Sequence, residues 1–211
     1  MRLRHVKNAY EIVSENKDIV IENPKEYKGR WKELLNTNGS ISLEVGCGKG
    51  KFLTENAIKF KENGYLGLEM MTSVICRATQ KVKELELPNV KLINQDAINL
   101  LDLFDEGELD RIYVNFPDPW PKKRHEKRRL TSPSFLAKYK TLLKKDGVFR
   151  FKTDNLDLYN YSLETVIPTL KDGYNCGEVD YTNQEIIMTE FETKFKNQGN
   201  PIYYIEGIFN E

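Results

Sequence analysis

The sequence is poor in residues that build disulfide bonds or metal centres. Its three cysteines, Cys47, Cys76 and Cys176, lie far apart and include no Cys-x-x-Cys pair, and only His5 and His125 could join them as ligands. Structural disulfides use paired cysteines, and zinc sites use closely spaced cysteine and histidine ligands. We therefore expect neither disulfides nor a metal site, which is consistent with a reducing cytoplasm.

Long apolar runs and an excess of one charge are also absent. No stretch reaches the roughly 18 apolar residues of a membrane span, and residues 1–5 lack the apolar region of a secretory signal. Lys and Arg together number 32, as do Asp and Glu, so the molecule has no net charge with which to attract a polyanion. Any site for nucleic acid must therefore be local.

Positive charge is concentrated in residues 122–129, whose sequence is Lys-Lys-Arg-His-Glu-Lys-Arg-Arg. The formal charge of this segment is +5, so the rest of the chain sums to −5. Such a run forms either a solvated face or a surface for phosphates, and charge alone does not choose between them. The preceding residues favour phosphates, because Asp118 stands there as a lone carboxylate between two prolines and two aromatic rings, Phe116 and Trp120.

Alternating strand and helix patterns predict an α/β fold in a chain of 211 residues, which is long enough for one sizeable core. We expect strands at residues 41–45, 64–69, 90–94, 110–115, 147–153, 174–181 and 202–209. Helices are expected at residues 27–35, 51–61, 72–85, 133–143 and 156–170. This order predicts a mostly parallel seven-stranded sheet with helices on both faces and an antiparallel edge. We assign residues 1–25 to a basic N-terminal arm, whose order the sequence leaves open, and residues 26–211 to a single domain.

A glycine turn, Gly46-Cys47-Gly48-Lys49-Gly50, follows the first expected strand. Between a strand and a helix it would open backbone N–H groups to a ligand, although such a turn alone is a weak indication. Glu69 follows Gly50 by 19 residues, close to the roughly 20 expected for an acid that binds a ribose diol. NAD and S-adenosylmethionine (SAM) both contain that ribose, so the turn does not choose between them.

Five acids stand at or just after expected strand ends: Glu44, Glu69, Asp96, Asp118 and Asp154. The carboxyl ends of parallel strands meet at one rim of a sheet, where ligands bind. Acids at this rim favour SAM over a dinucleotide, because SAM carries a sulfonium and an ammonium whereas a pyrophosphate is an anion. Asp96 suits either the adenine amino group or the N-cap of a helix, and both interpretations stay open.

The run Asn-Phe-Pro-Asp-Pro-Trp-Pro-Lys-Lys-Arg-His at residues 115–125 resembles the signature of the bacterial tRNA (guanine-N7-)-methyltransferase family. The likeness continues unbroken to Arg129, and residues 151–154 and 188–192 look like further motifs of that family. The resemblance therefore covers nearly the whole chain. It implies a Rossmann-like class I SAM-dependent methyltransferase fold, SAM as the cofactor, tRNA as the partner, and methyl transfer to N7 of a guanine in the variable loop.

Carried over by position, the resemblance implies three groups of site residues. Those around SAM are Glu44, Gly46, Gly48, Glu69, Asp96 and Asp118, of which Asp118 is also the expected catalytic residue. Those that bind the RNA substrate are Lys122, Asp154, Thr189, Glu190, Phe191 and Glu192. Those that meet the RNA backbone are Arg124, His125, Glu126, Lys127, Arg128 and Arg129. Residues 193–195 repeat the Thr-x-Phe pattern, so the sequence does not show which copy faces the guanine, nor whether the protein is a monomer or a homodimer.

The chemistry of guanine N7 suits these residues. N7 carries a lone pair in the neutral base, so the reaction needs alignment of the reacting atoms more than a strong general base. Methylation leaves the purine positively charged. A carboxylate such as Asp118 or Asp154, accepting hydrogen bonds from N1 and the amino group, would stabilise that charge and reject adenine. Trp120 and Phe116 either stack on a base or belong to the core.

Two other functions stay open at this point. An amino-group methyltransferase acting on adenine or on protein also places an acid or amide and prolines after the fourth strand. Its paired prolines are adjacent, whereas here Asp118 separates them. A non-catalytic RNA-binding protein of the same fold would not need the complete glycine turn together with Glu69 and Asp96.

Overall fold

The computed structural model describes residues 6–182 and 186–211. Its chain divides into two compact units, Met1–Asp105 and Glu106–Glu211, which we describe one at a time. No helix in the described part of the chain is long and apolar enough to cross a membrane.

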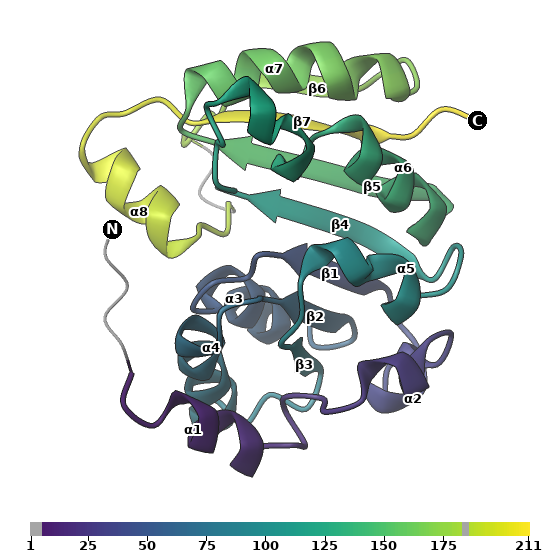
Figure 1. Ribbon diagram of the computed structural model, residues 1–211, viewed down its shortest axis with the longest axis vertical. Helices are drawn as coiled ribbons and strands as arrows, with labels where there is room; N and C mark the ends of the chain where they lie inside the picture. Colours follow the sequence, from purple (N-terminus) through teal and green to yellow (C-terminus); the bar gives the residue numbers. More distant parts are fainter. Residues whose placement is uncertain (1–5, 183–185) are drawn as a thin grey trace. The chain divides into compact units, whose positions relative to one another are not determined.

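The first unit is built around three parallel strands. These are β1 (Ile41–Val45), β2 (Gly64–Leu68) and β3 (Val90–Ile93), in the spatial order β3-β2-β1. The helices are α1 (Ala9–Glu15), α2 (Trp31–Leu34), α3 (Lys51–Lys59), α4 (Thr72–Glu84) and α5 (Leu100–Leu103), with 3-10 helices η1 (Pro24–Tyr27) and η2 (Ala97–Asn99). Every residue of β1 and β2 is buried, as expected for parallel strands covered on both faces. Helices α3 and α4 pack against β2 and β3 (Figure 1).

Several described residues before β1, among them Ala9, Ile19 and Val20, are buried in the core of this unit. Helix α1 packs against α4, and Val20 forms a parallel bridge to Leu92 of β3. The Ile21 N–H donates to the Leu92 carbonyl at 2.9 Å, and the Leu92 N–H donates to the Ile19 carbonyl at 2.8 Å. The sequence assigned residues 1–25 to a separate arm. Residues 1–5 lie outside the described residues, so the order of that part of the arm stays open.

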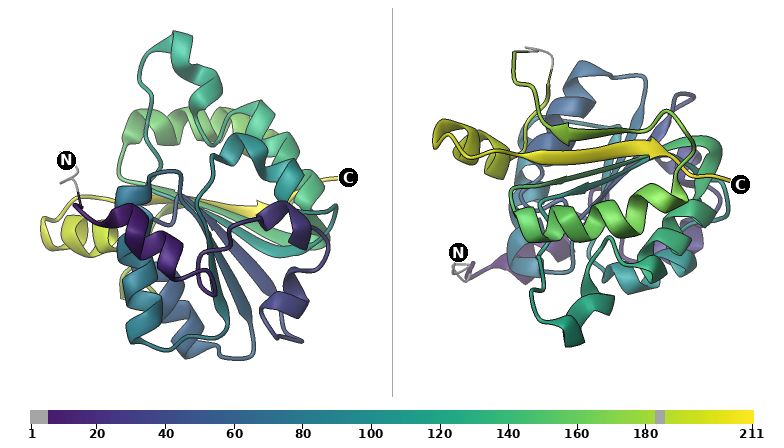
Figure 2. Two further views of the ribbon diagram at one scale, coloured as in Figure 1. Left: turned by 60° about the horizontal axis from the view of Figure 1, so that its bottom comes forward. Right: turned by 90° about the horizontal axis from the view of Figure 1, so that it is seen from above.

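The second unit contains four strands and three α-helices among its described residues. Its strands are β4 (Leu109–Asn115), β5 (Leu143–Thr153), β6 (Asn175–Glu178) and β7 (Tyr203–Ile208), in the order β4-β5-β7-β6. Its helices are α6 (Pro133–Leu142), α7 (Leu156–Val166) and α8 (Glu190–Asn197), with 3-10 helices η3 (Lys123–Arg128) and η4 (Ile167–Thr169). Strands β4 and β5 are parallel, whereas β7 is antiparallel to both β5 and β6. Helix α7 lies along β5 and β7, and η3 projects from the rest of the unit (Figure 2). Strands β7 and β6 form the antiparallel edge that the sequence predicts.

Several elements differ from the expectations, and three of these differences follow. The helix expected over residues 27–35 is interrupted at Gly29, whose φ of +77° is a left-handed conformation, so η1 and α2 replace it. Strand β5 begins at Leu143 rather than residue 147. Residues 190–197, for which the sequence analysis expects neither a helix nor a strand, form α8 because a capping box begins the helix.

Candidate functional site

The glycine turn of the first unit forms an open backbone cradle. Gly46, Gly48 and Gly50 have φ values of +77°, +58° and +78°, which L side chains rarely adopt. A Cβ atom at Gly46 or Gly48 would meet nothing within 4 Å, whereas one at Gly50 would lie 2.9 Å from Cβ of Ala78 on α4. The first two glycines therefore leave space beside the backbone for a ligand, and the third allows α3 and α4 to pack closely.

Glu69, directly after β2, is fixed beside this turn. Its Oε2 accepts a hydrogen bond from the Gly48 N–H at 3.3 Å, and its Oε1 accepts one from the Met71 N–H at 2.9 Å. The Glu69 N–H donates to the Ile93 carbonyl at 3.1 Å, and the side chain of Asn94 donates to the Glu69 carbonyl at 2.8 Å. Backbone donors therefore hold the carboxylate at the glycine turn, half-buried, in the position that suits a ribose diol.

Two further acids of the first unit lie at the carboxyl edge of the same parallel strands. Glu44 is the fourth residue of β1, two residues before Gly46, and is 2% exposed. Asp96 is exposed after β3, and one of its oxygens accepts from the Ile98 N–H at 2.9 Å as the N-cap of η2. The cap uses Oδ1 alone, so Asp96 both begins η2 and keeps an oxygen for a ligand.

Strained backbone surrounds Asp118 in the second unit. Phe116 and Trp120 have φ values of +51° and +42°, a region that bulky side chains rarely occupy. Such strain costs on the order of 1–3 kcal/mol per residue and persists only where the surroundings impose it. Asp118 lies exposed between these residues, after β4, and Asp154 lies exposed directly after the parallel neighbour β5. The structure thus brings both acids to the carboxyl edge of β4 and β5.

The residues at the start of helix α8 differ in their exposure to solvent. Thr189 is the N-cap: its Oγ1 accepts from the Glu192 N–H at 3.0 Å, and the Thr189 N–H donates to Glu192 Oε2 at 3.2 Å. Glu192 is 0% exposed, whereas Phe191 is 49% exposed. The Phe191 ring stacks on Phe116 at a centroid distance of 6.3 Å, which brings α8 beside the loop that carries Asp118. The same ring also stacks on Phe195, one helical turn further on.

A buried ion pair fastens α8 to β5. Lys152 Nζ lies 2.5 Å from Glu192 Oε1, with side chains 1% and 0% exposed. The Tyr181 hydroxyl donates to the same oxygen at 2.8 Å. Burial lowers the pKa of the Lys152 ammonium, and the charge of Glu192 opposes that change. Burial also raises the pKa of the Tyr181 hydroxyl, an effect to which its hydrogen bond to Glu192 adds. The sequence analysis gave neither Lys152 nor Tyr181 a role, although Lys152 lies in the motif at residues 151–154.

The basic segment is partly folded onto itself. Arg129 donates from Nε and Nη2 to the Trp120 carbonyl at 3.3 and 3.2 Å, and its guanidinium lies 4.2 Å from the centroid of the Tyr161 ring. Arg128 lies 4.9 Å from the centroid of Trp120. The Tyr161 hydroxyl donates to Glu126 at 3.2 Å, and burial followed by this hydrogen bond raises the pKa of Tyr161 to about 12. These residues shape the loop after Asp118.

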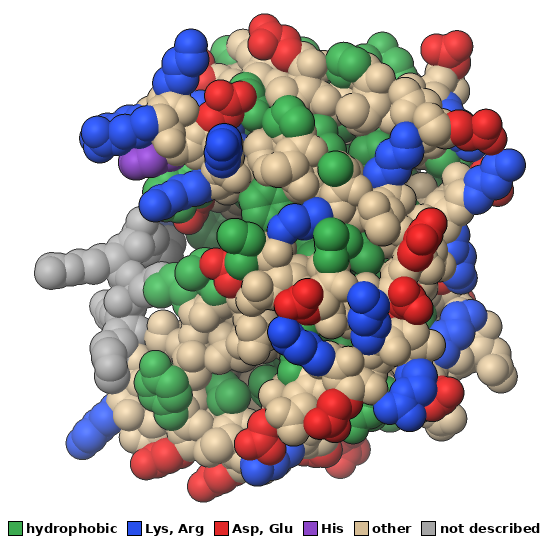
Figure 3. Space-filling model, turned by 45° about the vertical axis from the view of Figure 1, so that its right-hand side comes forward, with side chains coloured by type: hydrophobic (Ala, Val, Ile, Leu, Met, Phe, Trp, Pro, Cys, Tyr) green, Lys and Arg blue, Asp and Glu red, His purple; other side chains and the backbone are tan. Residues whose placement is uncertain are grey.

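Other cations of this segment point to solvent. Lys122, Lys123, Arg124 and Lys127 are all exposed, and His125 lies edge-on to Trp120 at 5.4 Å. His125 is the one histidine among the described residues, and Figure 3 shows Lys and Arg side chains gathered about it on the surface. The cations of the segment that phosphates can reach are therefore its three lysines, Arg124 and the exposed side of Arg128.

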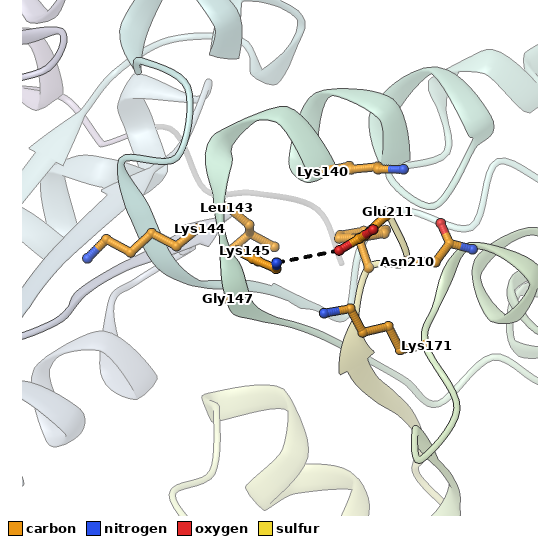
Figure 4. A pocket seen from close by; sticks show the side chains of 9 residues that line it. Lys140, Leu143, Lys144, Lys145, Gly147, Lys171, Asn210 and Glu211 are labelled. Atoms are coloured by element: carbon orange, nitrogen blue, oxygen red, sulfur yellow. Dashed lines mark ion pairs between the residues drawn. The ribbon is translucent and has the colours of Figure 1, made fainter.

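Two hollows of the second unit lie in different places, and one of them is at the end of β5 away from Asp154. One of about 290 Å³ lies within the basic segment and is lined by Lys123, Arg129 and Tyr161, among others. The other, of about 180 Å³, is ringed by lysines and by Glu211 at the start of β5 (Figure 4). Since Asp154 follows the last residue of β5, this lysine-lined hollow lies at the opposite end of the strand. Within the described ranges, no three His, Cys, Asp or Glu side chains are grouped to hold a metal ion.

The chain matches known methyltransferases along most of its length. Residues 38–205 match a family model described as "Putative methyltransferase". The tRNA (guanine-N(7)-)-methyltransferase of Bacillus subtilis strain 168 is 47% identical over 208 residues, which cover 98% of each chain. The enzyme of the same name from Lactococcus lactis subsp. cremoris strain MG1363 is 43% identical, with 99% of this chain and 98% of that one covered. The chain belongs to the tRNA (guanine-N(7)-)-methyltransferase family. The resemblance seen in residues 115–129 is thereby confirmed.

The fold prediction is confirmed by solved structures as well. The 16S rRNA methyltransferase KamB superimposes with a TM-score of 0.66 at 14% identity, covering 87% of this chain and 94% of that one. At this identity the likeness concerns the fold alone. It supports the Rossmann-like methyltransferase architecture that the alternation of strands and helices predicts.

Proposed function

We propose that this protein transfers a methyl group from S-adenosylmethionine to N7 of a guanine in tRNA and forms 7-methylguanosine, the variable-loop guanine being its target. The observation that carries the proposal is near full-length identity of 47% to an enzyme of that name. Taken by itself, each unit also holds residues that suit part of the required chemistry. We also propose that it acts in the cytoplasm, since its expected substrate is tRNA.

The residues of the first unit suit SAM. Bound SAM supplies a methyl group activated by a sulfonium. Glu69 is held by two backbone N–H groups, and its carboxylate is placed to accept hydrogen bonds from the ribose hydroxyls. Gly46 and Gly48 leave the space beside the turn open. Glu44 offers a buried negative charge near the turn for the cationic methionine part, and Asp96 offers an exposed oxygen for the adenine amino group.

The acids of the second unit suit a guanine. Asp118 and Asp154 stand at the carboxyl edge of β4 and β5, and both are exposed. A carboxylate that accepts hydrogen bonds from guanine N1–H and the amino group binds guanine and excludes adenine. It also stabilises the positive charge that develops on the purine as N7 is methylated. We assign the catalytic role to Asp118, because strained backbone on both sides holds it in place.

The exposed cations suit the RNA backbone. Lys122, Lys123, Arg124 and Lys127 would displace counterions from phosphates, which makes binding depend steeply on salt. In the segment 189–192, Glu190 and Phe191 are the members with exposed surface, so we assign direct contact with the RNA to these two. Arg128 and Arg129 shape the loop around Trp120 and contact RNA with the surface that remains.

The test is an assay of the purified protein with tritiated SAM and tRNA that lacks modifications. We expect tritium in tRNA, and we expect nuclease digestion to release it as 7-methylguanosine. Label in a methylated adenosine, or in protein, would favour an amino-group methyltransferase instead. Substituting the variable-loop guanine with adenine should abolish incorporation, and incorporation that persists would refute the assignment of that position.

A further inference from the structure

The carboxylate of Glu192 is fully engaged inside the second unit. Its Oε1 accepts from Lys152 Nζ at 2.5 Å and from the Tyr181 hydroxyl at 2.8 Å. Its Oε2 accepts from the Thr189 N–H at 3.2 Å. The side chain is 0% exposed. A carboxylate so enclosed and so bonded is not a surface to which an RNA substrate binds, although the family motif includes it.

Lys152 contacts the two segments that face the expected substrate. Its backbone carbonyl accepts from the Phe116 N–H at 2.8 Å, at the start of the strained loop that carries Asp118. Its side chain reaches α8 through Glu192. Asp154 follows two residues later in the chain. One residue of β5 therefore lies at the junction of the loop, the helix and the second acid.

Helix α8 needs such an attachment to hold its position. It has eight residues, and isolated helices shorter than about 12–15 residues are marginal in water. The capping box at Thr189 and Glu192 fixes the first turn but does not attach the helix to the sheet. Beyond that turn Lys194, Lys196 and Asn197 are exposed. The ion pair between Glu192 and Lys152 is a polar link from this helix to β5.

The attached helix presents an aromatic surface beside Asp118. Phe191 stacks on Phe116 with an interplanar angle of 20°, and Phe116 is two residues before Asp118. If α8 moved away, Phe191 would leave this position and the loop would lose a contact that supports its strained backbone. The position of α8 is thus coupled to the geometry of the expected guanine site.

We propose that Lys152 and Glu192 are a positioning pair for the methyl transfer: they touch neither SAM nor RNA and act by docking α8, with Phe191, against the loop that carries Asp118. This inference rests on the proposed function for its effect on tRNA, but its structural part concerns this unit alone. It reassigns Glu192 from substrate binding to the placement of its neighbours.

The energetics of buried ion pairs supply a discriminating experiment. Removing one partner leaves a buried charge without compensation, which is strongly destabilising, whereas removing both is far less costly. The variants are Lys152→Met, Glu192→Gln and the double variant. Lys144→Met is the matched control, because it breaks the exposed Lys144–Asp110 pair at the other end of the same strand. Thermal unfolding and SAM affinity are measured first for each protein.

The first readout is steady-state methylation of tRNA. We expect each single substitution to raise KM for tRNA at least about tenfold, with SAM affinity within twofold of wild type. The double variant should recover most of the loss, and Lys144→Met should match wild type. If Glu192 bound the RNA directly, substituting Lys152 as well could not restore tRNA affinity. Failure of the double variant to recover, or a wild-type KM in Lys152→Met, would overturn the proposal.

The second readout needs no substrate. Trypsin cleaves after Lys194 and Lys196, both exposed on α8, and cleavage requires the helix to open. Cleavage there in each single variant should be at least about tenfold faster than in wild type, relative to cleavage after Lys59 at the end of α3. The double variant and Lys144→Met should lie near wild type. Unchanged cleavage in Lys152→Met would refute the docking role. Because this assay is independent of methylation, it decides that role even if 7-methylguanosine is not formed.

Discussion

The two units build their parts of the site by different means. In the first, the positions of the functional groups are set by backbone: three glycines with positive φ form the turn, and two backbone N–H groups hold Glu69. In the second, they are set by side chains from distant segments, such as Lys152 with Glu192 and Arg129 with Tyr161. The first unit therefore uses glycine where the backbone is unusual, whereas the second places Phe116 and Trp120 in comparable conformations.

We infer from this difference that the site residues of the first unit are held more rigidly than those of the second unit. Glycine reaches positive φ without steric strain, so the glycine turn needs no packing partners to offset such strain. Phe116 and Trp120 reach it at a cost that their packing partners must offset. Variants of the second unit should accordingly disturb activity through neighbouring residues more often than variants of the first.

The largest effect should follow the loss of the Asp118 carboxylate. Asp118→Ala is expected to lower kcat by roughly 100- to 1000-fold, because one preorganised charge that acts in the transition state contributes about that much. tRNA affinity should change only a few-fold, since the exposed cations remain. Single-turnover kinetics and filter binding measure the two effects. Asp157→Ala, another exposed acid of this unit on α7, is the control and should be near wild type. Equal loss of binding and turnover would assign Asp118 to RNA affinity instead.

A smaller effect, confined to the cofactor, is expected at Glu69. Glu69→Ala removes a charged acceptor for the ribose hydroxyls and leaves the Gly48 and Met71 N–H groups without that partner, so SAM affinity should fall by about 10- to 100-fold. tRNA affinity should stay unchanged. Isothermal titration with SAM and filter binding with tRNA separate the two. Glu84→Ala, at the end of α4, serves as the control. A parallel loss of tRNA binding would contradict the assignment of Glu69 to SAM.

The same contrast explains what the sequence could and could not predict. The glycine turn and the spacing to Glu69 depend on local backbone, and the expected strand at residues 41–45 matches β1 at both ends. The expected helix at 72–85 ends within one residue of α4. Apolar runs and glycines carry this information in adjacent residues. The first unit is therefore the part of the site that sequence reasoning describes well.

Lys152 shows why the contacts of the second unit are harder to predict from the sequence. Lys152 lies between Phe151 and Thr153 at the buried end of β5. A lysine in such a position needs a partner for its charge. The partner, Glu192, lies 40 residues away, and no local pattern identifies it. A local signal for α8 did exist, since Thr189-Glu190-Phe191-Glu192 matches the capping box at the start of a helix. The placement of the helix on the sheet depends on tertiary contacts alone.

We expect two classes of cation in the basic segment: those that shape the loop after Asp118 and those that bind phosphate by charge alone. Arg129→Ala removes the hydrogen bonds to the Trp120 carbonyl and the contact with Tyr161, so it should destabilise the protein by about 1–2 kcal/mol and lower kcat as the loop loosens. Arg129→Lys should not restore these, because an ammonium cannot reproduce the planar fork.

Lys127→Ala gives the matching control. This exposed residue should contribute to RNA binding by charge alone, so the variant should keep kcat and thermal stability. It should reduce the slope of log affinity against log salt by about 1. Calorimetric unfolding and binding at several salt concentrations test both variants. The same salt-slope change and full stability in Arg129→Ala would show that Arg129 is a phosphate contact like the others.

The smallest effect concerns the hydroxyl of Tyr161, which supports this loop from α7. Its pKa is raised from 10.0 to about 12, first by burial and then by the hydrogen bond to Glu126. A group whose pKa is higher in the folded state contributes stability that is fully present below its unfolded pKa and is lost as pH rises through the folded value. Stability from Tyr161 should thus be intact below pH 10 and decline between pH 10 and about 12.

Tyrosinate absorbance of the wild type minus that of Tyr161→Phe isolates this titration. Glu126→Gln should shift the midpoint toward 10, because it removes the negative charge beside the hydroxyl while burial remains. Denaturant unfolding of the Tyr161→Phe variant should show a flatter decline over the same pH window. A midpoint near 10 in the wild type would mean that water reaches the hydroxyl, and that the side-chain packing of the second unit is looser at this loop than around Lys152.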